Sequence, residues 1–107
     1  PAPAVGAGRV FDVGAGAQHA PGQLYALDVS TGETLWQSDA DDIDTSPLVA
    51  AGTVYAGAGE SVRALDTSDG SRRFRHDVGT PLTTPPAAVD GLLLVGGTDG
   101  LYAFQES

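Results

Sequence analysis

Short apolar stretches alternate with turn residues along the whole chain, and none of them keeps a helical period for long enough to form a helix. The alternation is clearest in the middle of the sequence, where strands are predicted at residues 47–50, 53–56, 62–65 and 72–75. Turn residues separate them, and in the hairpin at 67–70 a glycine supplies the positive φ. The pattern therefore predicts an all-β protein of antiparallel strands.

The strand pattern recurs at intervals of 38 and 39 residues, because the motif LYALD at 24–28 returns as VRALD at 62–66 and as LYAFQ at 101–105. Upstream of each copy stands a proline, followed five residues later by a glycine and then by an apolar pair; the prolines are Pro3, Pro47 and Pro86. Four antiparallel strands in about 38 residues match one β-propeller blade. A sandwich of two sheets is the structural alternative, but it does not need a strict repeat.

The predicted fold is thus a β-propeller fragment of four-stranded antiparallel blades, with about 11 strands because the last unit supplies only three. Its repeat units are 1–46, 47–85 and 86–107, and together they form one partial propeller domain.

Several motifs carry a resemblance to a known family, namely LYALD at 24–28, TGE at 31–33, LW at 35–36, SPLV at 46–49 and DGLYA at 99–103. The chain resembles, over nearly its whole length, the PQQ-like repeats of quinoprotein-type β-propellers. The resemblance implies that Trp36 packs between neighbouring blades and that small residues of the motif let it dock. The blade-docking positions expected on this basis are Trp36, Phe74, Asp28, Asp66, Gly32 and Gly70. Phe74 departs from the pattern because it stands where the family has a tryptophan, and residues 14–22 form an insertion.

Three units are too few for a closed ring, because seven or eight blades at this period need roughly 270 to 300 residues. An open arc would also leave a strand edge unpaired, which is an aggregation hazard. We therefore interpret the chain as the C-terminal piece of a larger propeller, with Pro1 as a processed, cut or engineered end. The alternative is a ring assembled from several copies of this chain.

The charge of the chain excludes some classes of partner. Five arginines and no lysine stand against 14 acidic residues, which gives a net charge of −9. Nucleic acids and anionic membrane surfaces repel such a chain, and no apolar run is long enough for direct membrane insertion. Cysteine is absent, which excludes a disulfide framework and a thiolate metal site. The absence of lysine and asparagine fits a halophile or a high-GC organism.

The family resemblance raises the question of quinone chemistry. Enzymes of that family use a base Asp, calcium-binding Glu and Asn residues, and often a vicinal cysteine pair. This chain contains no Asn and no Cys, so it cannot supply two of these elements. No catalytic residue and no cofactor are therefore expected in this chain; PQQ and Ca²⁺ would require a site in the remainder of a larger propeller.

The acidic segment at residues 39–44 is the weak candidate for a metal site. Its carboxylates could attract Ca²⁺, which takes several oxygen ligands; they are Asp39, Asp41, Asp42 and Asp44. The segment lacks the later glycine and the glutamate of an EF-hand loop. We interpret it as a solvated loop between blades.

The histidines, the paired glycines and the basic run are interpreted as structural or surface residues. His19 and His76 have no His or Cys neighbour at ligand spacing, so both are interpreted as surface residues. The glycines at 14–16 and 57–59 do not continue as a phosphate-binding motif and are interpreted as turns. The basic run at 72–76 is typical of a protected edge strand, with an anionic partner as the alternative.

These observations favour a non-catalytic repeat module for protein binding, scaffolding or sensing. The resemblance implies envelope assembly scaffolds and sensor domains of bacterial protein kinases as examples, which favours an extracytoplasmic or cell-envelope location. The expected partners are the remainder of the propeller or another protein. Two alternatives stay open, the non-catalytic end of a PQQ-dependent quinoprotein dehydrogenase and a structural repeat of a surface layer.

Overall fold

A computed structural model describes residues 3–6, 8–14, 22–38, 43–89 and 91–105 of the chain. Within these residues the chain forms eleven β-strands in three antiparallel sheets, and it contains no helix. Two sheets have four strands and the third has three. The predicted all-β fold class, with about 11 strands in blade-like sheets, is confirmed.

Each sheet is an up-and-down meander in which sequential strands are neighbours. The first sheet, called the first blade below, consists of β1 (Ala4–Gly6), β2 (Arg9–Val13), β3 (Leu24–Asp28) and β4 (Thr34–Gln37). The second blade consists of β5 (Leu48–Ala50), β6 (Thr53–Ala58), β7 (Ser61–Asp66) and β8 (Arg72–Asp77). The third blade consists of β9 (Ala87–Val89), β10 (Leu92–Gly97) and β11 (Gly100–Gln105).

The strands of the second blade follow the predicted order; β6, β7 and β8 are longer than predicted, and β5 is one residue shorter. Gly57 and Ala58, which were predicted to belong to a turn, continue β6, because the hairpin to β7 turns at Gly59 and Glu60. The same extension lengthens β8 to Asp77. The longer strands allow six paired positions between β6 and β7.

The sequence repeat is also seen in the strand pairing, because the first two blades have a register shift at equivalent positions. In the first blade the pairing between β3 and β4 shifts between Ala26 and Leu27, and in the second blade the pairing between β7 and β8 shifts between Ala64 and Leu65. Such a bulge bends the strand locally and increases its twist. The outermost strands of these two blades are therefore bent at equivalent positions.

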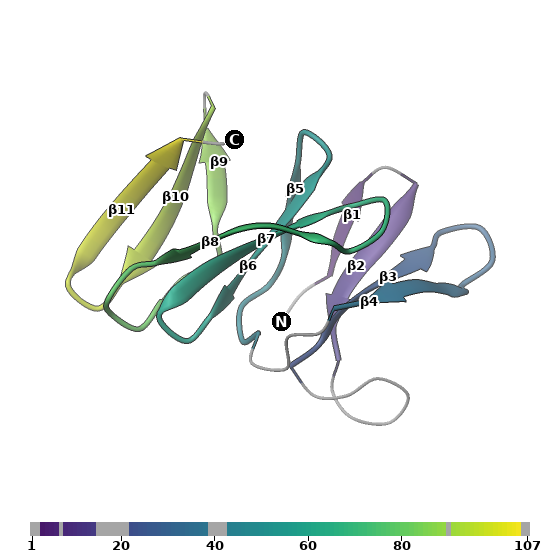
Figure 1. Ribbon diagram of the computed structural model, residues 1–107, viewed down its shortest axis with the longest axis horizontal. Coiled ribbons are helices and arrows are strands. Elements are labelled where there is room, and N and C mark those ends of the chain that lie inside the picture. The colour runs from purple at the N-terminus through teal and green to yellow at the C-terminus, as the bar shows by residue number, and fades with distance from the viewer. Residues whose placement is uncertain (1–2, 7, 15–21, 39–42, 90, 106–107) are drawn as a thin grey trace.

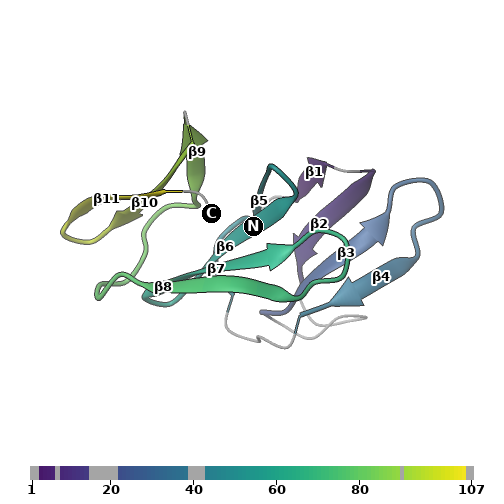
Figure 2. The same ribbon diagram turned by 45° about the horizontal axis from the view of Figure 1, so that its top comes forward.

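The three blades lie side by side (Figures 1 and 2), and the described chain measures 40 × 28 × 20 Å. Their first strands are neighbours, with β1 against β5 and β5 against β9. A side chain at Gly6 in β1 has no room there, because an ideal Cβ would lie 2.8 Å from Cγ1 of Val49 in β5. Close packing of the first strands places the outer strands further apart.

Apolar side chains fill the two spaces between the blades. Between the first and second blades the buried residues are Phe11, Val13, Leu24, Ala26, Ile43, Val54, Ala56, Ala58 and Leu65. Between the second and third blades they are Tyr55, Val62, Ala64, Leu93 and Val95. Since side chains alternate along a strand, β6 contributes side chains to both spaces, and all six of its residues are buried.

Candidate functional site

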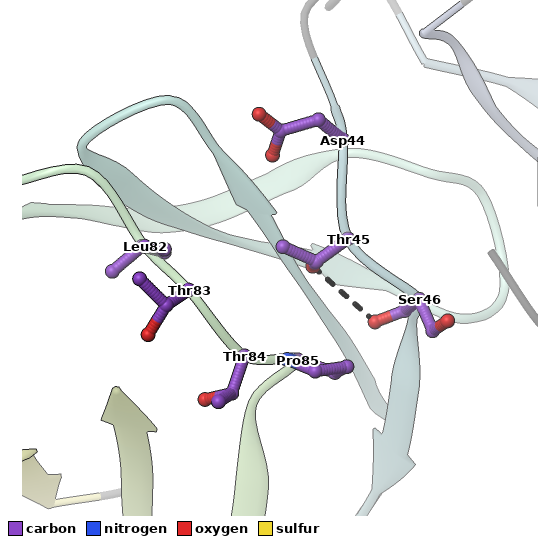
Figure 3. Close-up of a pocket in the computed structure, with 7 residues that line it drawn as sticks. All are labelled: Asp44, Thr45, Ser46, Leu82, Thr83, Thr84 and Pro85. Carbon is purple, nitrogen blue, oxygen red and sulfur yellow. Dashed lines mark hydrogen bonds between the residues drawn. The ribbon is translucent and has the colours of Figure 1, made fainter. Parts of the chain in front are cut away.

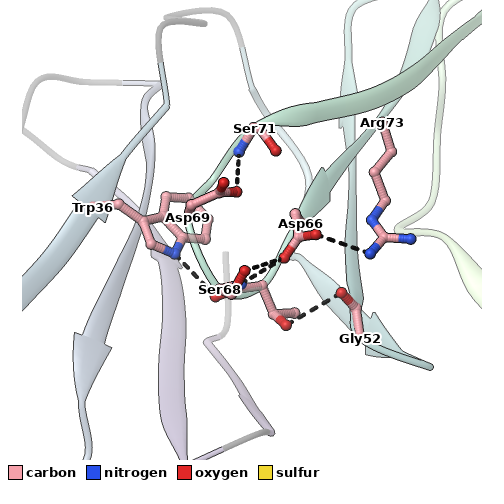
Figure 4. Close-up of polar contacts among 8 residues, drawn as sticks. Trp36, Gly52, Asp66, Ser68, Asp69, Ser71 and Arg73 are labelled. Carbon is pink, nitrogen blue, oxygen red and sulfur yellow. Dashed lines mark hydrogen bonds and ion pairs between the residues drawn. The ribbon is translucent and has the colours of Figure 1, made fainter.

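The residues expected to dock blades meet at the boundary between the first and second blades. The indole Nε1 of Trp36 in β4 donates a hydrogen bond to the carbonyl oxygen of Thr67, at 3.0 Å, in the turn between β7 and β8 (Figure 4). The ring lies over Gly70 of the same turn, where an ideal Cβ would be 2.5 Å from Trp36 Cε3. The ring of Phe11 in β2 also lies near the indole, with ring centroids 5.8 Å apart. Trp36 thus joins the two blades by packing and by one hydrogen bond.

Asp66 fixes the turn that receives Trp36. Its Oδ1 accepts hydrogen bonds from the backbone N (2.8 Å) and the hydroxyl (2.6 Å) of Ser68, and its Oδ2 pairs with the guanidinium of Arg73 at 2.9 Å. These hydrogen bonds, those from Ser68 first, lower the pKa of the Asp66 carboxyl to about 2. The Asp66 carboxylate is therefore ionised at neutral pH, where it accepts all three of these bonds.

The first blade carries the same turn, with no Trp36 equivalent over it among the described residues. Asp28 Oδ1 accepts hydrogen bonds from the backbone N of Ser30 and of Thr31, at 2.8 and 3.1 Å. Gly32 has φ +77°, as Gly70 has φ +76°, but an ideal Cβ at Gly32 would meet no atom within 4 Å. The structure thus brings Trp36 and Gly70 together, whereas no described residue packs over Gly32 in the turn that Asp28 holds.

Aromatic rings form the boundary between the second and third blades. Phe74 in β8 lies 6.0 Å from Tyr55 and 4.8 Å from His76, measured between ring centroids. His76 in turn stacks on Phe104 of β11, at 4.5 Å with an interplanar angle of 9°. From the sequence His76 was predicted to be a surface residue, and its stack on Phe104 was not predicted. The signal for it was the spacing of two from Phe74, which places both rings on one face of a strand.

The remaining residues of the basic run lie on the exposed side of β8. Arg73 pairs with Asp66, and Arg75 Nε donates to Asp77 Oδ1 at 3.0 Å, with about half of the Arg75 side chain exposed. Exposed pairs of this kind contribute about 0 to 1 kcal/mol each. The run therefore presents an aromatic side to the third blade and a charged side to solvent.

A pocket of about 290 Å³ lies where the connection before β5 approaches the connection before β9 (Figure 3). Its lining residues are Asp44, Thr45, Ser46, Leu82, Thr83, Thr84 and Pro85. Two of its threonines bind the backbone of central strands: Gly57 N in β6 donates to Thr45 Oγ1 at 2.7 Å, and Gly96 N in β10 donates to Thr84 Oγ1 at 3.1 Å. The two contacts are equivalent, and in each the threonine hydroxyl oxygen accepts a hydrogen bond from a backbone N–H group.

A second cavity, of about 520 Å³, lies between the first and second blades. Its lining residues are Ser38, Ile43, Arg63, Leu65, Gly70, Ser71 and Arg72. Arg63 Nε donates to Ser61 Oγ at 3.3 Å. Among the described residues that line this cavity, Arg63 and Arg72 are the charged ones.

Of the metal candidates only Asp44 lies within the described residues; Asp39, Asp41 and Asp42 fall outside them, as does His19. The Asp44 backbone N donates to the carbonyl oxygen of Gly57 at 2.9 Å, and its carboxylate borders the smaller pocket. In the described part of the chain no three His, Cys, Asp or Glu side chains gather closely enough to hold a metal ion. Nor do these residues include a helix that could span a membrane.

Solved structures with the same arrangement of blades are β-propellers, and the chain has that fold. BamB from Moraxella catarrhalis superposes with a TM-score of 0.76 at 21% identity, over 94% of this chain and 29% of that one. The computationally designed Ika4 protein gives 0.77 at 15% identity, over 98% and 64%. The quinohemoprotein alcohol dehydrogenase ADHIIG from Pseudomonas putida HK5 gives 0.76 at 22% identity, over 96% and 18%.

The family model described as outer membrane protein assembly factor BamB matches residues 1–107, and the chain belongs to this family of PQQ-like propeller repeats. A curated relative, the serine/threonine-protein kinase AfsK of Streptomyces griseus, is 30% identical over 89 residues. That match covers 72% of this chain and 11% of the kinase. The chain therefore spans only about a tenth of this relative and less than two thirds of the solved structures named above.

Proposed function

We propose that the chain is a non-catalytic β-propeller module for protein binding, scaffolding or sensing, and that the outward faces of its first and third blades pack against the remainder of a larger propeller or against another protein. The observation that carries the proposal is the contrast between the second blade, whose strand β6 is buried on both faces, and the two end blades. Each end blade is covered on one face only. Propeller blades with an uncovered apolar face are suited to receive a further sheet.

The first open face consists of Val5, Val10, Asp12, Tyr25 and Leu27, which alternate with the buried residues of their strands. The third open face consists of Ala87, Val89, Leu92, Leu94, Leu101 and Ala103. Val5 is 70% exposed and Leu101 72% exposed, far above what core residues show. Both faces are continuous sheet surfaces, so the partner that fits them is a sheet with an apolar face.

The blade-docking residues belong to the same proposal. Trp36, Gly70 and Asp66 hold the second blade on the first, and Phe74 takes part in holding the third. Asp28 and Gly32 keep the equivalent turn of the first blade ready for an aromatic residue from a preceding blade. This role rests on the equal φ of the two glycines and on the open space over Gly32.

No cofactor is proposed for this chain. Its sequence offers neither Asn nor Cys for a quinone site, and the threonines of the smaller pocket bind backbone groups. The family description, an outer membrane protein assembly factor, supports an extracytoplasmic or cell-envelope location. Its assembly role favours scaffolding, whereas the match to a protein kinase favours sensing.

The alternative function is the non-catalytic end of a quinoprotein dehydrogenase, and the likeness to ADHIIG favours it. Near-ultraviolet quinone absorbance of the natural protein that contains this chain, and its reduction of a dye with an alcohol or a sugar, separate the two. We expect neither; a quinone spectrum together with dye reduction would contradict a non-catalytic module and favour the dehydrogenase.

The binding faces are tested with the fluorescent apolar probe 1-anilinonaphthalene-8-sulfonate on the folded, dilute chain. We expect the probe to bind, and we expect Val5→Glu and Leu101→Glu each to reduce its fluorescence while the free energy of unfolding changes by less than about 0.5 kcal/mol, as for exposed positions. A folded chain that leaves the probe unbound would refute the proposal.

A further inference from the structure

The cavity of about 520 Å³ between the first and second blades carries two arginines from neighbouring strands. Arg63 lies in β7, and Arg72 is the first residue of β8. Arg72 is the cross-strand partner of Leu65, which stands two residues after Arg63 in β7. Since side chains alternate along a strand and cross-strand partners share a face, both arginines lie on the face that holds Leu65. This face looks toward the first blade, because Leu65 packs in the core between these two blades.

The bulge of the second blade places Arg72 on this face. From Leu65 to Ala64 the partner in β8 changes from Arg72 to Phe74, so Arg73 is the extra residue. In regular pairing Arg72 and Phe74 would share one face of β8, whereas Phe74 packs against the core on the side of the third blade. Bulges redirect side chains in this way, and they are common next to active sites.

The repeat does not account for the two arginines. The position of Arg63 holds a tyrosine in the other two units, Tyr25 and Tyr102, and the position of Arg72 holds Thr34 in the first unit. Both departures fall in the second unit and line the same cavity. Like charges at neighbouring positions of one sheet face destabilise a fold. The two arginines are therefore not explained by folding, and they are suited to hold a negative charge.

The guanidinium of Arg72 is available to a ligand. The ion pairs of β8 are made by Arg73 and Arg75, and the Arg72 guanidinium has no hydrogen-bond or ion-pair partner among the described residues. Arg63 Nε donates a hydrogen bond to Ser61 Oγ at 3.3 Å, which orients the second guanidinium. Arginine is suited to carboxylates because its planar group donates two parallel hydrogen bonds.

The cavity also has an apolar part. Ile43 and Leu65 line it, and both side chains are buried. Its volume lies in the range of small-molecule sites. A compact inorganic ion would leave these two side chains without a contact, and the net charge of −9 on the chain disfavours a ligand with several negative charges. The ligand that fits is a single carboxylate on a short apolar group.

We propose that this cavity binds a small organic anion that consists of a carboxylate and a short apolar group. Arg72 and Arg63 hold the carboxylate by charge-assisted hydrogen bonds, and Leu65 and Ile43 contact the apolar group. Both blades that border the cavity have four strands, so the site does not depend on the outward faces of the end blades. The inference goes beyond the proposed function, because it concerns a small ligand inside a blade boundary.

Titration of the isotope-labelled whole chain with hexanoate, followed by NMR, tests the proposal. We expect saturable shifts of the backbone amides of Gly70, Ser71 and Arg72, which line the cavity, and unchanged amides in β10. Hexanamide has a similar shape without the charge, and inorganic phosphate has charge without the apolar group. Both should bind at least about tenfold more weakly than hexanoate. Equal affinity for either of them would overturn the proposal.

Variants of the arginines locate the site. Arg72→Gln and Arg63→Tyr should each weaken hexanoate binding at least about tenfold. Arg63→Tyr introduces the residue of the other two units and should therefore keep the fold. Arg75→Gln is the matched control and should change the affinity less than about threefold, because Arg75 lies across from Arg63 but pairs with Asp77 and is not among the lining residues. Equal losses in all three variants would show that the general charge of the strand attracts the anion, and would overturn the proposal.

The acidic segment of the chain provides a further test. Asp39, Asp41 and Asp42 stand in the sequence between the lining residues Ser38 and Ile43, and they fall outside the described residues. Replacing all three by asparagine removes negative charge and should raise the affinity for hexanoate. Binding by this triple variant alone would show that the chain's own carboxylates occupy the arginines, and would overturn the proposal. The absence of saturable shifts in both chains would overturn it as well.

Discussion

The two boundaries between blades solve the same packing problem with different residues. Between the first and second blades one tryptophan lies over a glycine of the next blade and donates a hydrogen bond to its turn. Between the second and third blades, Phe74, His76 and Phe104 form a row of rings. The difference follows from what the next blade presents. The second blade has a turn between its third and fourth strands, whereas the third blade has three strands in the described residues. The comparison teaches that the kind of side chain that docks one blade on the next depends on the surface that the next blade presents.

Trp36→Ala is expected to have the largest effect on this comparison. The substitution removes the ring and the hydrogen bond to Thr67, so the free energy of unfolding should fall by about 3 kcal/mol, the lower part of the range for buried aromatic truncations because the ring is only half-buried. Phe74→Ala should cost less, about 2 kcal/mol, because the stack of His76 on Phe104 remains at this boundary. Urea denaturation of both variants measures the difference. A loss below about 1 kcal/mol for Trp36→Ala would show that the ring does not hold the blades together.

Gly70→Ala and Gly32→Ala form a matched pair. Both glycines have φ near +76°, so each substitution should cost about 1 kcal/mol in backbone strain. Gly70→Ala should lose at least about 1 kcal/mol more, because its methyl group meets the Trp36 ring. In a Trp36→Ala background this extra loss should vanish, which a double-mutant cycle detects. Equal losses for both glycines in the wild-type background would argue against close docking at Gly70.

His76→Ala tests the second boundary. Loss of the stacked ring should lower the free energy of unfolding by about 1 kcal/mol, in the range of aromatic pairs. Arg75→Ala, on the exposed side of the same strand, should change it by less than about 0.5 kcal/mol. If thermal or urea unfolding shows the reverse order, His76 is a surface residue and the stack contributes nothing.

The smallest expected effect is on the pH dependence of stability. The pKa of Asp66 is lowered in the folded chain to about 2, so the ionised carboxylate stabilises the fold above its unfolded pKa of about 4. That contribution should be lost as the pH falls from about 4 towards 2. Asp66→Asn should therefore flatten this part of the stability profile. An unchanged profile in the variant would show that the bonds from Ser68 and Arg73 do not persist in solution.

The repeat made the fold predictable, because strand, turn and bulge recur at one spacing. The sequence also placed Trp36 and Phe74, and likewise Gly32 and Gly70, at equivalent positions of successive units. Which glycine lies under which ring depends on how whole sheets pack together. For the same reason the pairing of His76 with Phe104 was missed, since the two residues belong to different blades. The complete burial of β6 could not be read from its alternation either, because both of its faces are covered.

Hydrogen–deuterium exchange, measured by mass spectrometry, tests most directly the claim that the second blade is held on both faces while each end blade of this chain is held on one. The amides of β6 should exchange at least tenfold more slowly than those of β2 and β10. Uniform exchange across the three blades would contradict the claim.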